Sequence, residues 1–280
     1  MGLSCKKAYS SMPGNEIATA KALFLCKDIV SLSHIGQIRS IEVPGLNYQS
    51  NILIQNIDVL DDLLSPDQSS KKADIYINGI GVSIKQVGAT FAFNRLQRAN
   101  IIDIFSQLNF NDPADSLSRL DQEVVRFHNG LLSRRNRPWE NFFSEGEFKK
   151  LTEYLMMKGN PNIGKSNYPA DLILESCITE SDLERKDLTQ IAEEKLHLYT
   201  FNEYFEKYKA HFKIAIRRSW IGQKSKSEHG RAVSLSKKSL NDPWVFSGSS
   251  GTPTTGWQPD FSEEQIKTVY YLMIEKTQTM

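Results

Sequence analysis

The sequence predicts an α/β fold in which helices flank a mixed central β-sheet, with further strands and loops in the C-terminal third. Segments with an apolar residue every three to four positions interrupt short runs of alternating apolar residues. Asn78-Gly79 separates two of those runs, and no stretch approaches the roughly 20 apolar residues of a membrane helix. With 280 residues, 40% of them apolar, we expect one domain (1–280) with insertions and no membrane contact.

The N-terminal elements follow from local patterns. Residues 16–32 place apolar side chains on one helical face, with Asn15 as a plausible N-cap. Residues 38–54 predict short strands broken by Pro44-Gly45, and residues 58–64 predict a helical turn.

A β-hairpin from Asp74 to Lys85 is the strongest local prediction. Asn78-Gly79 tolerates the positive φ angles of a type I′ turn, which sets Ile77 opposite Ile80. Five alternating apolar residues then share one buried face: Ile75, Ile77, Ile80, Val82 and Ile84.

The later elements are predicted from periodicity, caps and composition. Residues 91–108 have helical spacing, and the capping box of Ser144 and Glu147 begins a helix that ends near Met157. The remaining segments are charged helix formers over 183–209, a strand over 211–216 and a final helix over 262–276.

Charge is unevenly distributed along the chain. The net charge of +1 argues against a simple polyanion binder, yet residues 206–240 hold ten Lys and Arg against two acids, a local charge of +8. Cys5, Cys26 and Cys177 lie far apart without a Cys-x-x-Cys pair, so we expect reduced thiols. No export signal is recognisable, which predicts a cytoplasmic protein.

The second face of the hairpin carries the chemistry. Asp74 and Ser83 are expected with Cβ atoms about 5 Å apart, and Lys85 lies one diagonal away at about 7 to 8 Å. Phosphodiester hydrolysis needs a carboxylate to hold a divalent metal and a cation to position the attacking water and stabilise charge. Asp74 and Lys85 are suited to these roles.

These residues resemble the PD-(D/E)xK nuclease superfamily, and within it the type II restriction endonucleases. In that family an Asp on one strand precedes an (Asp/Glu)-x-Lys on the next, behind a helix that often brings a Glu. Asp74, Lys85 and Glu16 match those positions, over about residues 15–105. Two departures are Ala73 in place of the family's proline and Ser83 in place of its second metal-binding acid.

The resemblance implies a restriction-endonuclease-like fold and a Mg²⁺-dependent enzyme that cuts double-stranded DNA at a specific site and leaves 5′-phosphates. It would act as a homodimer in the bacterial cytoplasm, without a nucleotide cofactor. Asp74 would hold the metal and Lys85 would position the water, with Ser83 and Glu16 in the same catalytic set. Glu16, Gln86 or Asp103 could complete the metal shell.

We expect the catalytic part within residues 1–110 and a DNA-contacting region over 206–260. The first group of expected DNA contacts begins at the end of the hairpin: Gln86, Asn94, Arg95, Gln97 and Arg98. The second group lies in the basic segment: Arg217, Arg218, Lys224, Lys226 and Arg231.

Other patterns keep alternatives open. Gly159–Ser166 fits the phosphate-loop pattern G-x-x-x-x-G-K-[ST] of GTP-binding proteins, but a helix rather than a strand is predicted before it. Asp171 and Glu175 form a second acid-strand pattern, for which a turn role for Asp171 is favoured. A structure-specific repair or mobile-element nuclease and a DNA-binding module without activity remain rival functions.

Overall fold

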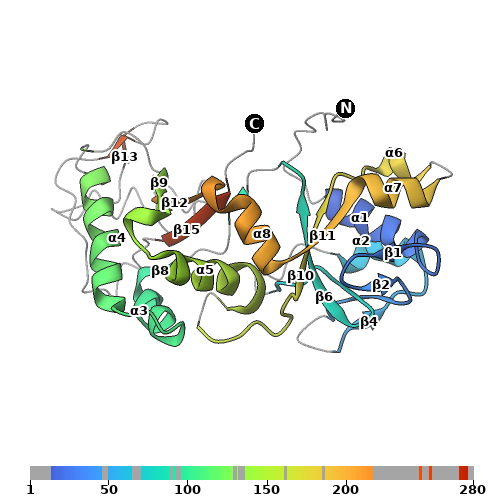
Figure 1. The fold of residues 1–280 in the computed structure, drawn as a ribbon, viewed down its shortest axis with the longest axis horizontal. Helices are drawn as coiled ribbons and strands as arrows, with labels where there is room; N and C mark the ends of the chain where they lie inside the picture. Colours follow the sequence, from blue (N-terminus) through green and yellow to red (C-terminus); the bar gives the residue numbers. More distant parts are fainter. Residues whose placement is uncertain are drawn as a thin grey trace.

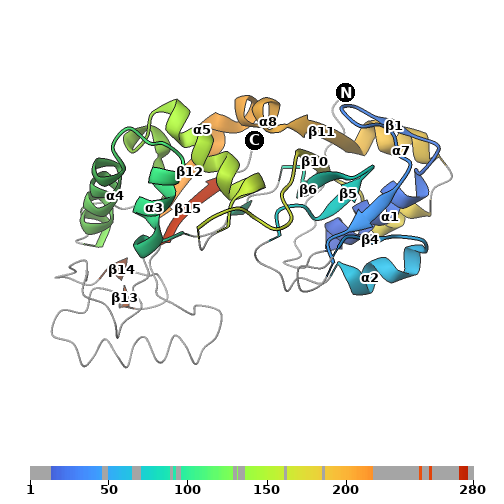
Figure 2. The same ribbon diagram turned by 90° about the horizontal axis from the view of Figure 1, so that it is seen from below.

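The computed structural model shows an α/β protein whose two larger β-sheets lie side by side (Figure 1). It describes residues 14–45, 50–64, 71–88, 91–92, 96–128, 131, 136–160, 163–184, 187–216, 246–247, 252–253 and 271–276. Figures 1 and 2 place α3 and α4 at one end of the molecule and α1, α2 and α7 at the other.

A six-stranded mixed sheet forms the centre of one half, in the order β11-β10-β6-β5-β3-β4. β6 and β10 are parallel, and the other neighbouring pairs are antiparallel, so the predicted mixed sheet is confirmed. Two of its strands lie beyond residue 110. The six strands are β3 (Ile41–Val43), β4 (Ile52–Leu53), β5 (Ile75–Ile77), β6 (Ile80–Gln86), β10 (Leu172–Ser176) and β11 (Leu196–Thr200).

The β5–β6 hairpin has the predicted register. Ile77 pairs with Ile80 and Ile75 with Val82, and the turn residues Asn78 and Gly79 have φ angles of 52° and 78°. Beyond the turn, Gly81 lets another segment approach β6, because a Cβ atom there would stand 2.3 Å from the Pro169 carbonyl oxygen. This close approach brings β10 beside β6.

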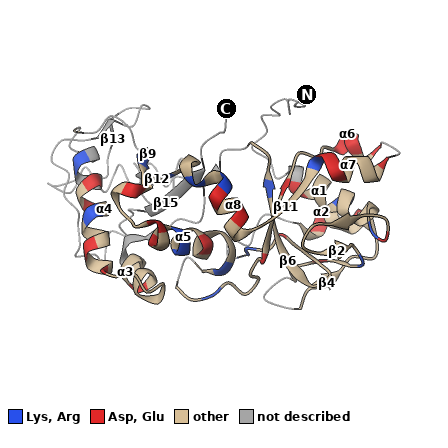
Figure 3. Ribbon diagram, in the orientation of Figure 1, with Lys and Arg blue, Asp and Glu red and all other residues tan. Residues whose placement is uncertain are grey.

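Helices cover the apolar face of the hairpin. α1 (Gly14–Leu25) contributes Leu23 to a core that contains all the predicted apolar hairpin residues, with Ile80 only partly buried. The elements around it are η2 (Ile57–Val59), α2 (Leu60–Leu63), α6 (Glu180–Leu183) and α7 (Leu188–Lys195). Figure 3 shows acidic residues gathered on α6 and α7 at this end of the molecule.

The prediction that the first helix continues to about residue 32 is wrong. The chain leaves α1 after Leu25, and Asp28 adopts a φ of 63°, which a helix does not accommodate. A small hairpin follows, formed by β1 (Ser31–Leu32) and β2 (Gly36–Gln37).

A second core, rich in aromatic residues, lies on the other face of the six-stranded sheet and extends under a second sheet. That sheet has the order β7-β15-β12-β9, with β8 also pairing β15. Its strands are β7 (Phe91–Ala92), β8 (Leu96–Gln97), β9 (Asn136–Pro138), β12 (Phe212–Ile216) and β15 (Tyr271–Lys276). The remaining elements are α3 (Arg98–Gln107), α4 (Pro113–His128), η3 (Trp139–Asn141), α5 (Glu145–Glu153), the π-helical turn η4 (Tyr154–Lys158), α8 (Phe201–Tyr208), η5 (Lys209–His211), β13 (Phe246–Ser247) and β14 (Thr252–Pro253).

The capping box that begins α5 and the strand β12 are confirmed, but three other predictions are corrected here. Residues 91–108 hold two short strands before α3, and residues 183–209 are divided by β11. Tyr271–Lys276 is a strand where a helix was expected, because β12 and the short strands β7 and β8 offer it hydrogen-bonding partners distant in sequence.

Two simpler predictions also have outcomes. Among the described residues no helix is long and apolar enough to cross a membrane. Cys26 and Cys177 form no disulfide with each other, and Cys5 lies outside the described residues.

Candidate active site at the base of the hairpin

Asp74 lies at the open end of the β5–β6 hairpin, where its carboxylate meets the backbone and side chains of β6. Its Oδ2 atom accepts hydrogen bonds from the Ile84 N–H at 2.6 Å and the Ser83 hydroxyl at 3.4 Å. The same oxygen is 3.8 Å from Lys85 Nζ. Oδ1 accepts no hydrogen bond from the part of the chain that the structure describes, so one oxygen of Asp74 is open to a ligand.

Lys85 is held over this carboxylate by two hydrogen bonds. Its Nζ donates to Ser83 Oγ at 2.7 Å and to the Ile84 carbonyl oxygen at 2.8 Å. The Lys85 and Asp74 side chains are 21% and 24% exposed, so both are accessible from one side. The predicted convergence of Asp74, Ser83 and Lys85 is therefore confirmed.

Glu16 reaches the same site from the first turn of α1. Burial, followed by the charge of Asp74, raises the pKa of its carboxyl group to about 7, although the charge of Lys85 opposes this shift. α1 is anchored near the site because the Thr19 hydroxyl donates to Ser176 Oγ at 2.8 Å, at the end of β10. Residues far apart in the sequence thus bring two carboxylates and one ammonium group together.

Two lysines that the sequence analysis above does not single out also lie at the site. Lys72 is buried, and its Nζ donates to the Leu155 carbonyl oxygen at 2.5 Å. Burial, followed by repulsion from Lys85, lowers the pKa of Lys72 to about 7. Burial also lowers the pKa of Lys71, and the charge of Asp74 opposes that shift. The available signal was the pair of lysines directly before Ala73-Asp74.

Glu175 on β10 is another residue whose position sequence analysis missed. β6 is the neighbouring strand of β10, and Glu175 is in register with Lys85. Glu175 is 1% exposed and accepts hydrogen bonds from Tyr208 and Lys207. Asp171 lies directly before β10, where it accepts from the Gly81 N–H and forms an ion pair with Lys158.

Several predicted residues do not join the cluster. Asp103 is exposed on α3, which packs against α4, β8 and β15 in the other half of the molecule (Figures 1 and 2). The metal role expected for Asp103 is therefore corrected. Gln86 is the exposed last residue of β6, while Gln97 ends β8 and Arg98 begins α3. The other expected DNA contacts lie outside the described residues: Asn94, Arg95, Arg217, Arg218, Lys224, Lys226 and Arg231.

The phosphate-loop pattern does not have the surroundings that nucleotide binding needs. Gly159 follows the helical turn η4, and the described part of the segment leads through coil into β10. Asn160 N–H donates to Gly164 O, and the Tyr154 hydroxyl donates to both Asn160 O and Gly164 O. A phosphate loop instead connects a strand to a helix N-terminus.

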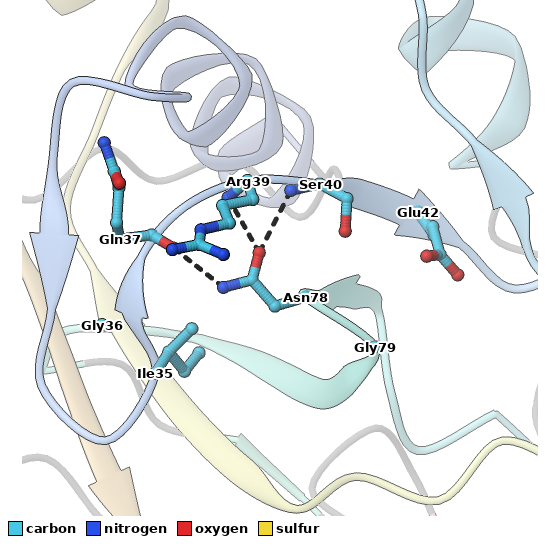
Figure 4. A pocket seen from close by; sticks show the side chains of 8 residues that line it. All are labelled: Ile35, Gly36, Gln37, Arg39, Ser40, Glu42, Asn78 and Gly79. Atoms are coloured by element: carbon cyan, nitrogen blue, oxygen red, sulfur yellow. Dashed lines mark hydrogen bonds between the residues drawn. The ribbon is translucent and has the colours of Figure 1, made fainter.

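A pocket lies at the opposite end of the hairpin, around its turn (Figure 4). Its walls include Arg39, Glu42 and Asn78. The Asn78 side chain is occupied there, because it accepts from the Arg39 and Ser40 N–H groups and donates to Gln37 O. This pocket is separated from Asp74 and Lys85 by the length of the hairpin.

The donor set at the hairpin base is small. Among the described residues no group of three or more His, Cys, Asp or Glu side chains is arranged to hold a metal ion. The cluster offers two carboxylates, from Glu16 and Asp74.

Comparison of the chain with protein-family models gives no match, and neither do comparisons with curated proteins and with solved structures.

Proposed function

We propose that this protein is a Mg²⁺-dependent endonuclease that hydrolyses double-stranded DNA in the manner of type II restriction endonucleases. The observation that carries the proposal is the meeting of Asp74, Lys85 and Glu16 at the base of one hairpin. Titratable groups that are partly buried, at a cost to their charged forms, and that still face an open side of the site are typical of catalytic centres.

The order of these groups along the chain supports the same proposal. A helix brings Glu16, the next part of the chain brings Asp74 before β5, and β6 brings Lys85. This is the order in which the resembled nucleases place their helix acid, strand acid and lysine. Two departures remain, Ala73 and Ser83, and the second leaves the lysine hydrogen-bonded to a hydroxyl group in place of an acid.

The two carboxylates fit a hard cation such as Mg²⁺. One oxygen atom of Asp74 accepts no hydrogen bond from the described residues. Burial and the charge of Asp74 raise the pKa of Glu16, and a bound cation would favour the charged form of this carboxyl group. Asp74 and Glu16 would hold the ion. When bound, it would act as a Lewis acid on the phosphate and lower the pKa of a bound water.

Lys85 is the group that would position water and stabilise the developing charge. Its ammonium group is fixed by Ser83 and Ile84, so its direction is set before substrate arrives. Attack of water on phosphorus with departure of the 3′ oxygen would leave a 5′-phosphate on one product and a 3′-hydroxyl on the other.

The substrate class follows from the distribution of charge along the chain. Lys71 lies shortly before Asp74, and residues 206–240 carry a local charge of +8, both suited to a phosphate backbone. We infer a restriction-endonuclease-like fold in which the basic segment supplies the DNA-binding strands and loops. A homodimer that matches a palindromic site and a bacterial cytoplasmic setting complete the proposal.

Plasmid digestion with Mg²⁺ or EDTA tests this function. Wild type is compared with Asp74→Asn and Lys85→Met, and the exposed Asp171–Lys158 ion pair supplies the matched controls Asp171→Asn and Lys158→Met. Discrete Mg²⁺-dependent fragments, lost in the first two variants and kept in the controls, are expected.

Other results would point elsewhere. A smear of fragments would favour a structure-specific nuclease, and DNA binding without any cleavage would favour a binding module. Cleavage by both Asp74→Asn and Lys85→Met would remove the hairpin base from consideration.

A further inference from the structure

A second charged cluster stands beside the proposed active site and has no part in the chemistry above. Lys207 of α8 donates to Glu175 Oε2 at 3.2 Å and to the Tyr199 hydroxyl at 2.5 Å. Its Nζ lies 4.4 Å from the centre of the Tyr199 ring and 4.9 Å from that of Tyr208. The Tyr208 hydroxyl donates to Glu175 at 2.6 Å, so the ammonium group and its anchor are both fixed.

Strand register places this cluster close to Lys85. Lys85, Glu175 and His197 are Cα partners across β6, β10 and β11, so their side chains project from one face of the sheet. Neighbouring strands are about 4.8 Å apart. Lys207 is bonded to Glu175 of β10 and to Tyr199 of β11, so its ammonium group stands over the first and second strands beyond β6. α8 packs on β10 and β11 where the two halves of the molecule meet (Figure 1).

Lys207 differs from an ordinary buried ion-pair partner in its access to solvent. Its side chain is 43% exposed, whereas that of Glu175 is 1% exposed. Burial works against its charge, but hydrogen bonds to Tyr199 and Tyr208 and the charge of Glu175 outweigh burial and raise its pKa above the usual lysine value. A cation is thus presented to solvent in one orientation, with much of its side-chain entropy already lost.

We propose that Lys207 binds the DNA backbone phosphate next to the scissile one, with Glu175 and Tyr208 as positioning residues for its ammonium group. Each strand of a duplex carries a phosphate every 3.4 Å of helix axis. A cation over the first and second β-strands beyond β6 would therefore meet a neighbouring phosphate of the DNA strand held at Asp74 and Lys85. This inference rests on the proposed nuclease function.

The salt dependence of DNA binding tests this role. Binding of a short fluorescent duplex of mixed sequence is measured in EDTA over a range of salt concentrations. The slope of log K against log salt should fall in magnitude by about 0.9 for each phosphate that the protein no longer neutralises. Lys207→Met should show a decrease of that size, and Lys207→Arg should restore most of the wild-type slope.

Two further variants guard against a folding defect. Lys207→Met leaves Glu175 buried without its cation, so the double variant Glu175→Gln/Lys207→Met removes both charges and should show the same decrease in slope. Lys195→Met is the matched control, because Lys195 of α7 is also paired with a buried acid, Asp182, at 2.6 Å, and lies outside residues 206–260. Its slope should equal that of wild type.

The outcomes separate this inference from the function beneath it. A wild-type slope in the folded double variant would overturn the phosphate contact. Lys207 would then serve only to hold α8 against β10. Absence of salt-dependent DNA binding by wild type would overturn the nuclease proposal, and the phosphate contact with it. Wild-type cleavage with a reduced slope in both Lys207→Met and the double variant supports both.

Discussion

The two ends of the β5–β6 hairpin are built on the same strands but obey different physical rules. At the turn, Asn78 has the positive φ that its residue type tolerates, and its side chain makes hydrogen bonds with Arg39, Ser40 and Gln37. At the base, the charge of Asp74 acts on the buried carboxyl group of Glu16, and Lys72 is buried near Lys85.

The difference indicates which end serves stability and which serves chemistry. At the turn, local sequence preference, register and hydrogen bonding agree, as expected of a segment that specifies the fold. At the base, the pKa of an acid is raised to about 7 and that of a lysine is lowered to about 7. The fold holds both groups in surroundings that disfavour their charged forms, as proteins do at sites where such groups bind or transform a ligand.

Exchange of Lys85 for methionine should have the largest effect on function. The change removes the ammonium group that we place at the developing charge, so the cleavage rate should fall by at least about 100-fold. The melting temperature should change little, since the side chain is partly exposed and its ion pair with Asp74 is at 3.8 Å. Rate and thermal unfolding are measured together with Lys158→Met, and equal rates in the two variants would contradict the assignment.

Exchange of Asn78 for alanine should have the largest effect on stability. It removes the Asn78 side-chain hydrogen bonds and places alanine at a φ of 52°, so the free energy of unfolding should fall by about 3 kcal/mol. Urea denaturation measures this change in the free energy of unfolding. Cleavage by the remaining folded protein should be unchanged.

Asn56→Ala is the matched control for the turn. Asn56 caps a short helical turn with one hydrogen bond to the Asp58 N–H, so its loss should lower the free energy of unfolding by about 1 kcal/mol. If Asn78→Ala were no more destabilising than Asn56→Ala, the turn would not be a main determinant of stability.

The same contrast explains what sequence could predict. The hairpin was predictable because Asn78-Gly79 and the alternation of Ile75, Ile77 and Val82 are local signals, and they fixed the register that brings Asp74 to Lys85. The position of Glu175 beside Lys85 was not predictable, because it depends on a parallel pairing between segments about 90 residues apart, roughly a third of the chain. Lys72 was missed because only the tertiary fold buries it.

The strand Tyr271–Lys276 was mispredicted for a related reason. Its composition suits a helix as well as a strand, and its pairing with β12 decides the outcome. Nonlocal partners, rather than local preference, thus determine both this strand and the neighbours of the active site.

Exchange of Glu16 for glutamine should alter the pH dependence of stability. The folded protein holds the Glu16 proton up to about pH 7, whereas the unfolded chain loses it near 4.5, so stability falls as pH rises between these values. Each pH unit corresponds to about 1.4 kcal/mol, which solvent screening reduces to a total of about 2 kcal/mol. In EDTA, Glu16→Gln should therefore be more stable than wild type at pH 8 and equal to it at pH 4.

Mg²⁺ supplies the control for that measurement. If Glu16 helps to hold the ion, Mg²⁺ should stabilise wild type at pH 8 and stabilise Glu16→Gln less. Equal stabilisation of both proteins would exclude Glu16 as a ligand while leaving its titration intact.

Exchange of Ser83 for alanine should have the smallest effect on cleavage. It tests whether the Ser83 hydroxyl group replaces the acid that the resembled nucleases have at this position. Ser83 Oγ accepts from Lys85 and donates to Asp74, but each partner keeps a hydrogen bond with Ile84. Loss of one such bond corresponds to about 1 kcal/mol, so cleavage should fall about fivefold. Ser116→Ala is the control, because Ser116 is also buried and accepts from a cation, Arg119, in the other half of the molecule. A loss with Ser83→Ala as large as with Lys85→Met would mean that the hydroxyl group itself takes the place of the absent carboxylate.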